Sequence, residues 1–146
     1  MRRIQIQDDY GDHLSTVSAP DGSVDLEGAD LSGLSAPNSK ILKGRSMRGA
    51  NCYWVSLSEA DLSGCNFEGA DLRGANLRGS RLVGANLRNA NLALDNLGGS
   101  TDLHGADLTS AILNGANLSG ARYDGNTRFP KGFSPASAGM VEEDVA

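Results

Sequence analysis

Residues 70–92 read Ala-Asp-Leu-Arg-Gly, Ala-Asn-Leu-Arg-Gly, Ser-Arg-Leu-Val-Gly, Ala-Asn-Leu-Arg-Asn, Ala-Asn-Leu. A large apolar residue returns every five positions, and a small residue stands two positions before it. The pattern extends outward from this stretch to Ala50 and to Leu97. A period of five matches neither the 3.6 of a helix nor the 2 of a flat strand. The spacing therefore predicts another kind of regular structure.

A strict short repeat predicts a solenoid, because one unit is too small to bury its own apolar residue. If the chain turns a corner every five residues, four units close a square coil of about twenty residues. Successive coils would pair edge to edge about 4.8 Å apart. Gly, Asn, Asp and Ser, which turn corners at low cost, fill the other positions. The inward positions then predict a core made of Leu57, Leu62, Phe67, Leu72, Leu77, Leu82, Leu87, Leu92, Leu97, Leu103, Leu108, Leu113 and Leu118.

The Ala-(Asp/Asn)-Leu-x-x pattern of these units resembles that of the pentapeptide-repeat family. The resemblance implies an all-β fold, a right-handed quadrilateral parallel β-helix with about five coils of four pentapeptides. It implies less about function, because most members serve unknown roles. The best understood members protect DNA gyrase by resembling DNA.

One domain with three segments is expected from the length of 146 residues. Residues 24–125 form the predicted β-helix, and residues 1–23 form an N-terminal cap, because an open coil end is an unpaired sheet edge. Residues 126–146 are predicted to form a C-terminal cap and tail. There Phe129 and Phe133 would close the coil, and residues 142–144 would fray.

Two interruptions of the repeat are visible. Between residues 34 and 48 one residue is gained, and a loop or bulge is favoured there because an inward Lys40 or Arg45 would bury an unpaired charge. After Leu97 the apolar positions move by one residue, which predicts a corner bulge within residues 97–100. Asp95 holds a position that Ala holds elsewhere. It either turns away from the core or caps the amides of the Gly98-Gly99 turn, and we favour the cap.

Several function classes are disfavoured by composition. A net charge of −5 opposes direct binding of nucleic acid. No apolar signal peptide core or membrane-spanning run is present, which predicts a cytoplasmic protein without a membrane partner. Cys52 and Cys65 occupy inward positions and are predicted to be reduced core thiols. His104 is predicted to be a solvated side chain. Without a catalytic constellation, a metal-spaced cluster or a phosphate loop, we expect no enzyme activity, no cofactor and no metal.

The charge pattern bears on DNA mimicry. With four units per coil, residues about twenty apart stack, and one predicted column reads Asp61, Arg81, Asp102, Arg122. Residues 24–125 contain eleven acidic and nine basic side chains, and no long projecting loop is evident. The primary hypothesis is therefore a noncatalytic module that binds or scaffolds proteins. The alternative is a DNA-mimicking protector or inhibitor of gyrase or topoisomerase, of the quinolone-resistance or self-resistance type.

A candidate interface follows from apolar residues at outward positions. In the expected register one face carries Tyr53, Trp54, Arg73, Leu94 and Ile112. Arg73 would lie one coil from Tyr53, close enough for a cation–aromatic contact. Clustered apolar side chains on a polar rod indicate an association surface for a protein partner of unknown identity or for a second copy in a homodimer. The competing interpretation is that Tyr53 and Trp54 pack on the N-terminal segment.

Overall fold

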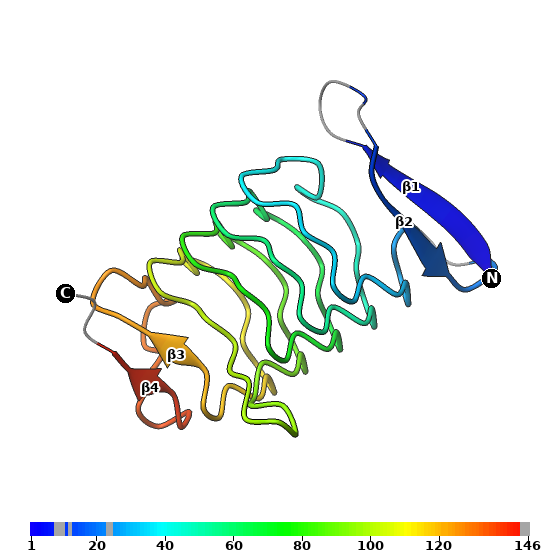
Figure 1. Cartoon of the computed structure of the whole chain (residues 1–146). Coiled ribbons are helices and arrows are strands. Elements are labelled where there is room, and N and C mark those ends of the chain that lie inside the picture. Colours follow the sequence, from blue (N-terminus) through cyan, green and yellow to red (C-terminus); the bar gives the residue numbers. More distant parts are fainter. Residues whose placement is uncertain (8–10, 12, 23–24, 144–146) are drawn as a thin grey trace.

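Successive turns of the chain stack along one axis, from an N-terminal hairpin to a short C-terminal pair of strands (Figure 1). This computed structural model describes residues 1–7, 11, 13–22 and 25–143. The expected boundary at residues 23 and 24 and the expected fraying of Asp144 lie outside these residues. None of the described segments is a helix that could span a bilayer.

Two pairs of strands lie at the ends of the stack (Figure 1). Strand β1 (Arg2–Gln7) pairs antiparallel with β2 (His13–Ala19). Strand β3 (Arg122–Tyr123) pairs in parallel with β4 (Val141–Glu142). The hairpin joins the first coil through the Asp30 amide, which donates to the Ser18 carbonyl at 2.6 Å.

Between β2 and β3 the straight segments are so short that each pairs through a single residue. Asn51 pairs in parallel with Asp71, and Asp71 with Asn91, so residues 20 apart lie side by side. The Asp71 amide donates to the Ala50 carbonyl at 3.0 Å, and the Asp71 carbonyl accepts from the Cys52 amide at 2.7 Å. Each middle coil thus binds its neighbours on both sides, and few backbone groups are left without partners. Four five-residue units complete one turn.

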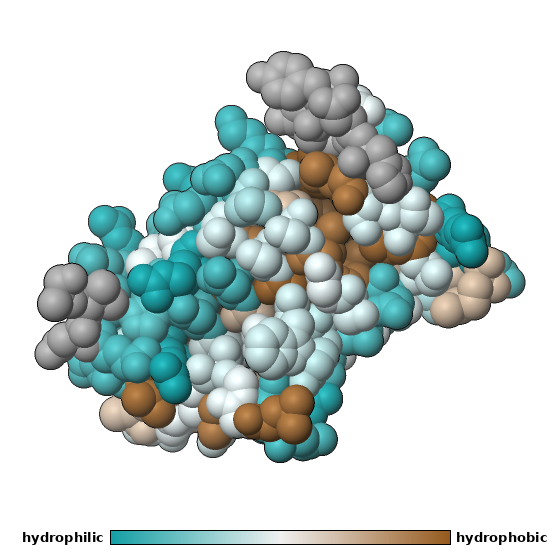
Figure 2. Space-filling view, viewed as in Figure 1, coloured by the Kyte–Doolittle hydropathy of each residue, from teal (hydrophilic) through white to brown (hydrophobic). Residues whose placement is uncertain are grey.

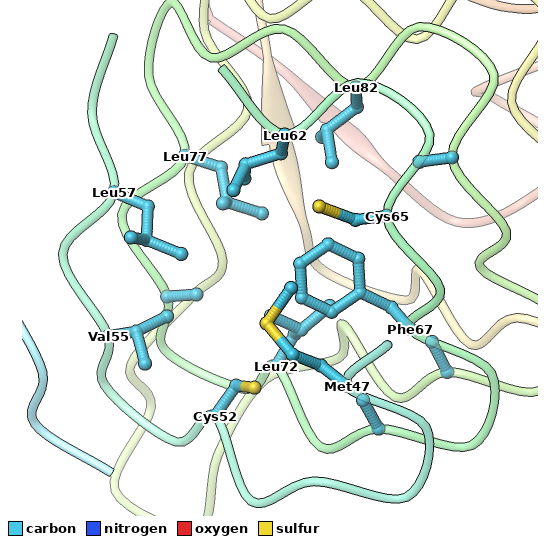
Figure 3. Packing of buried hydrophobic residues seen from close by; sticks show 14 of the residues in the cluster. Met47, Cys52, Val55, Leu57, Leu62, Cys65, Phe67, Leu72, Leu77 and Leu82 are labelled. Atoms are coloured by element: carbon cyan, nitrogen blue, oxygen red, sulfur yellow. The ribbon is translucent and has the colours of Figure 1, made fainter. Parts of the chain in front are cut away.

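The inward side chains fill the space enclosed by the turns (Figure 3). The pairing register places Phe67 between Met47 of the preceding coil and Leu87 of the next. A buried Leu stabilises the fold by about 1.5–3 kcal/mol relative to an exposed one. Small residues occupy the other inward position, and where these are polar they bond to a carbonyl, as Ser80 does to Leu77 at 2.8 Å. The buried members of the expected core are Leu57, Leu62, Phe67, Leu72, Leu77, Leu82, Leu87, Leu92, Leu103, Leu108 and Leu118, with Leu113 partly buried.

Both cysteines are free and buried inside the coil, in agreement with the expectation of core thiols. Burial raises the pKa of the Cys52 thiol far above its usual range. Burial also raises the pKa of Cys65 to about 11, and the Cys65 Sγ donates to the Leu42 carbonyl at 2.8 Å. Because the thiolate is the reactive form, both side chains act as small apolar residues.

The first interruption is a one-residue bulge, as expected. Ile41 is half-buried, whereas Leu42 is buried, so the extra residue lies between Ala36 and Leu42. Lys40 stays exposed. In the unit before the bulge the large and the small inward residue have changed places. Leu34 occupies the position that a small residue holds elsewhere, and Ala36 occupies the position of the large apolar residue.

The second interruption differs from the expected one-residue slip. Asn76 pairs with Asp102 and Asn91 with Asn117, so partners stand 26 residues apart and six residues have been inserted. These six form the 95–100 loop. Leu97 is therefore not a core residue: its side chain is 86% exposed. The cause is Asp95, because an inward Asp95 would place a carboxylate in the core, which costs several kcal/mol. Thr101 resumes the small inward position instead.

This insertion also changes the columns of stacked residues. Asp107, not Asp102, lies beside Arg81, while Asp102 lies between Asn76 and Arg122. The predicted column of Asp61, Arg81, Asp102 and Arg122 is therefore wrong from its third member onward.

The C-terminal end is more ordered than the sequence indicates. Arg128 pairs with Asp107, so parallel pairing continues beyond residue 125. Phe129 contacts the Tyr123 ring edge to face at 5.4 Å between centroids, and Phe133 lies 5.2 Å from Phe129. Glu142 belongs to β4, and the Glu143 amide donates to the Tyr123 carbonyl at 2.8 Å. The expected fraying of these two residues is therefore wrong.

Candidate binding face

One side of the coil is built on Cys52, Leu72 and Leu92, whose preceding residues pair in register. The outward residues after these three positions are Tyr53 and Trp54, then Arg73, then Ala93 and Leu94. Since partners 20 apart stack, these side chains lie along a single face. We call the surface made by Tyr53, Trp54, Arg73, Leu94 and the 95–100 loop the Trp54 face.

Ile112 does not belong to this face. It pairs with Asn86, and its amide donates to the Ala85 carbonyl at 2.9 Å. The insertion is one whole unit longer than the expected slip, and one unit is a quarter of a turn. Ile112 therefore lies on the neighbouring side of the rod, half-buried, and Asn117 takes the place beside Asn91.

Trp54 adopts a conformation that glycine holds in most units. Its φ is 58°, in the left-handed region, where Gly74 has a φ of 71° at the equivalent place of the next coil. The indole lies over Gly74, where an added Cβ would stand 3.1 Å from the Trp54 Cε2. It also reaches the loop, because a Cβ on Gly99 would stand 2.9 Å from the Trp54 Cζ2. Trp54 thus leans toward the C-terminal end, whereas the N-terminal hairpin bonds to Asp30 at the opposite end.

Arg73 is held between an acid and an aromatic ring. Its Nε and Nη2 donate to the two oxygens of Asp71 at 2.9 and 2.7 Å. The Arg73 Cζ lies 5.7 Å from the centre of the Tyr53 ring, which is the cation–aromatic contact expected from the spacing. The hydrogen bonds from Arg73 lower the pKa of Asp71 below its usual range. The pair is therefore ionised and fixed at neutral pH.

Asp95 ties the 95–100 loop to the face. Its Oδ1 accepts from the amides of Leu97 at 2.8 Å and Gly99 at 2.6 Å, and its Oδ2 accepts from the Tyr53 hydroxyl at 3.1 Å. Desolvation raises the pKa of Asp95, but the bonds from Gly99, Leu97, Tyr53 and Trp54 outweigh it and the pKa is lowered. The preferred interpretation of this residue as a turn cap holds, with Leu97 and Gly99 as the capped amides.

Three large apolar side chains emerge around this anchored loop. Leu97 is 86%, Trp54 50% and Leu94 47% exposed. Hydrophobic side chains are visible at the lower edge of the space-filling view, where the 95–100 loop protrudes in Figure 1 (Figure 2). Beside them lies an open polar groove of about 320 Å³, lined by Gly49, Ala50, Asn51, Tyr53, Gly69, Asp71, Arg73 and Asn96. The face thus offers an apolar projection next to a groove.

Sequence reasoning missed Leu97 and Asn96 as members of this face. Leu97 continues the five-residue period, so the period alone assigns it to the core. The signal that could have found the loop is Asp95, the only acid at a small inward position between residues 50 and 97. A carboxylate there indicates that its unit leaves the coil.

His104 is not solvated as expected. Its side chain is 5% exposed, with Nδ1 on Asp102 and Nε2 3.1 Å from a Glu143 oxygen. The C-terminal segment folds back over this outward position, and a repeat pattern carries no signal for such a contact. Among the described residues, no group of three His, Cys, Asp or Glu side chains is arranged to hold a metal ion.

The family model for pentapeptide repeats matches residues 42–74, 56–93 and 100–122 in eight copies. The chain belongs to the pentapeptide-repeat family. The resemblance seen in the sequence is therefore confirmed. The fold is a right-handed β-helix, as in the pentapeptide-repeat structures that it resembles. No curated protein matches the sequence.

Solved pentapeptide-repeat structures cover most of the chain. Rfr23 from the cyanobacterium Cyanothece 51142 is 33% identical with a TM-score of 0.64, over 78% of this chain and 71% of that one. The protein alr5209 from Nostoc PCC 7120 is 30% identical with a TM-score of 0.44, over 78% and 84%. QnrB1, a plasmid-mediated fluoroquinolone resistance protein, is 16% identical with a TM-score of 0.50, over 82% and 79%. The likeness to QnrB1 concerns the fold alone.

Proposed function

We propose that this pentapeptide-repeat protein is a noncatalytic protein-binding module, a rod of about five capped coils that engages a protein partner through the Trp54 face. The observation that carries the proposal is the conformation and exposure of Trp54. A non-glycine residue in the left-handed region costs about 1–2 kcal/mol. Glycine would avoid this cost at Trp54, as it does at Gly64 and Gly69. Glu59, Asn89 and Ser110 share this backbone conformation, but Trp54 is the one large apolar residue among the described residues that does, and its side chain is half-exposed. Strain at such a residue is typical of a functional site.

The anchored loop supports the same function. The Asp95 bonds to Leu97, Gly99 and Tyr53 fix the loop before a partner arrives, so little conformational entropy is lost on binding. Leu97 then projects as an apolar contact, with Trp54 beside the loop. Tryptophan and arginine are the residues most enriched among those that dominate binding energy, and both are present on this face.

The charge pattern favours protein binding over DNA mimicry. A DNA mimic requires rows of free carboxylates, but Asp71 binds Arg73 at 2.7 Å and Asp102 binds Arg78 at 3.0 Å. The column beginning at Asp61 alternates acid and arginine as far as Arg128. The likeness to QnrB1 rests on the fold, and these described carboxylates stand beside arginines rather than in the continuous acidic stripe that mimicry requires.

The test is a matched pair of substitutions. Leu97→Ser removes the projecting side chain, and Leu14→Ser makes the same chemical change at a 38% exposed position of β2. We expect quantitative cross-linking in host cells to lose the partner with Leu97→Ser and to retain it with Leu14→Ser. Light scattering of the purified variants reports whether the partner is a second copy. Equal capture by both variants would reject the Trp54 face.

A supercoiling assay distinguishes the protein-binding module from the alternative, a DNA-mimicking protector or inhibitor of gyrase. We expect DNA gyrase to supercoil plasmid normally at low micromolar concentrations of the protein. Inhibition of supercoiling, or protection of gyrase from a quinolone, would instead support the DNA-mimicking function.

A further inference from the structure

Five side chains of alternating charge run along one side of the rod toward its C-terminal end. Arg78 Nη1 donates to Asp102 Oδ2 at 3.0 Å, and the other oxygen of Asp102 contacts the His104 Nδ1. The His104 Nε2 stands 3.1 Å from the Glu143 Oε1, and Arg122 Nη1 donates to the Glu143 Oε2 at 3.2 Å. The series joins the main coils to the residue that follows β4.

The geometry around His104 is favourable to one protonation state of the ring. Both ring nitrogens face carboxylate oxygens, and an ionised carboxylate only accepts hydrogen bonds. A neutral imidazole carries one N–H and so can make one of these two bonds. Both contacts are attractive only when His104 is an imidazolium, because only the charged ring forms an ion pair with each carboxylate. In the neutral form a lone pair of the ring would face a carboxylate oxygen, which is repulsive.

What Glu143 holds in place is a short segment. Strand β4 has two residues, and its Val141 is about half exposed. Its backbone bonds to the coil run from the Val141 amide to the Ala121 carbonyl and from the Glu143 amide to the Tyr123 carbonyl, both 2.8 Å. Together with the pairing of β3 and β4 and the contact of Glu142 with Tyr123, the two charged contacts of the Glu143 side chain keep the segment docked.

We propose that His104 is the protonation switch of a latch that holds residues 141–143 on the last coil. When His104 is charged, it binds Asp102 and Glu143 together and the latch is closed. When His104 loses a proton, its ion pair with Glu143 is lost and the segment detaches. Detachment uncovers the carbonyls of Ala121 and Tyr123, leaving β3 as an open sheet edge.

The charged groups around the ring set the direction of the pH dependence. Asp102 and Glu143 contact the ring, Asp124 lies close enough to interact with it, and Arg78 and Arg122 flank the two acids. The latch is closed while His104 is an imidazolium and opens when, at higher pH, the ring loses its proton.

The test is amide hydrogen exchange by NMR at about pH 5.5 and about pH 8, on either side of the imidazole range. Exchange is expressed as protection factors, which remove the intrinsic effect of pH. We expect the protection of the Val141 and Glu143 amides to fall about tenfold at the higher pH, relative to the mid-rod amide of Leu77. At about pH 5.5 the ¹⁵N shifts of His104 should be those of an imidazolium.

Three variants make the test specific. His104→Gln should abolish the difference between the two pH values, whereas His13→Gln, at the other histidine of the chain, should leave it as in the wild type. Glu143→Gln should abolish it too, because an amide can accept from a protonated nitrogen and donate to a bare one. The proposal is overturned if His104 is neutral at about pH 5.5, or if the pH-dependent loss of protection persists without His104.

Discussion

The unit around Leu92 and the unit around Leu97 have the same five-residue spacing, but only the first packs into the coil. Leu92 lies entirely inside the coil, whereas Leu97 is the most exposed large apolar side chain among the described residues. The two units differ at the small inward position, where the first has Ala90 and the second Asp95. The five-residue spacing of the leucines thus marks the units that could pack into the coil. The residue at the small inward position, two before the leucine, decides whether a unit packs there or leaves the coil.

Removing a leucine from the regular part should have the largest effect. Leu77 is fully buried in mid-rod. We expect Leu77→Ala to lower the free energy of unfolding by about 2–5 kcal/mol, because the side chain loses its burial and leaves a cavity. Denaturant unfolding followed by circular dichroism measures this. A loss below about 1 kcal/mol would mean that the coils do not depend on this layer.

The second prediction compares two glycines of the regular coils. Gly74 has a φ of 71° and Gly84 a φ of 68°, but only at Gly74 would a Cβ meet a side chain, the Trp54 ring at 3.1 Å. We expect Gly84→Ala to cost about 1–2 kcal/mol through backbone strain. Gly74→Ala should cost about 1 kcal/mol more, because the indole must move.

A double-mutant cycle isolates the contact in that pair. With Trp54→Ala in the background, the two glycine substitutions should cost the same within about 0.5 kcal/mol. If Gly74→Ala remains the more costly, its effect does not come from Trp54.

The third prediction concerns the Asp95 anchor. Because the pKa of Asp95 is lowered by its bonds to the loop and to Tyr53, the anchor is intact at neutral pH and is lost as the pH falls through that lowered value, below the usual range of a carboxyl group. Trp54 is the only tryptophan of the chain and lies against the loop. We expect its fluorescence to shift to longer wavelength on acidification before the far-ultraviolet circular dichroism changes.

Asp95→Asn is the matched variant. Its Oδ1 can still accept from Leu97 and Gly99 but cannot be protonated in this range. The early fluorescence shift should therefore disappear. A shift that persists in this variant would assign the acid transition to another group.

Much of the molecule follows from sequence because its contacts are periodic. Residues 20 apart stack on successive coils, and this spacing correctly predicted the core leucines of residues 57–92 and the contact between Arg73 and Tyr53. Prediction failed where a contact depends on a local event or on distant segments. Ile112 was misplaced because a six-residue insertion looks like a one-residue slip when Leu97 keeps the period. The burial of His104 by Glu143 joins residues 39 positions apart outside the repeat, and no period encodes it.

The smallest effect is expected at the tip of the loop, with Leu97→Ser. The Leu97 side chain is exposed, and its link to the fold is the backbone amide that donates to Asp95 at 2.8 Å, which serine retains. The free energy of unfolding should therefore change by less than about 0.5 kcal/mol, the usual range for surface positions. The same denaturant measurement as for Leu77→Ala checks this. A loss above about 1 kcal/mol would mean that Leu97 packs on the coil in solution. Its place in the five-residue period would then reflect a role in stability. If Leu97→Ser leaves the free energy of unfolding unchanged but abolishes partner binding, the two units have different roles. Leu92, inside the coil, then stabilises the rod, whereas Leu97, outside it, binds the partner.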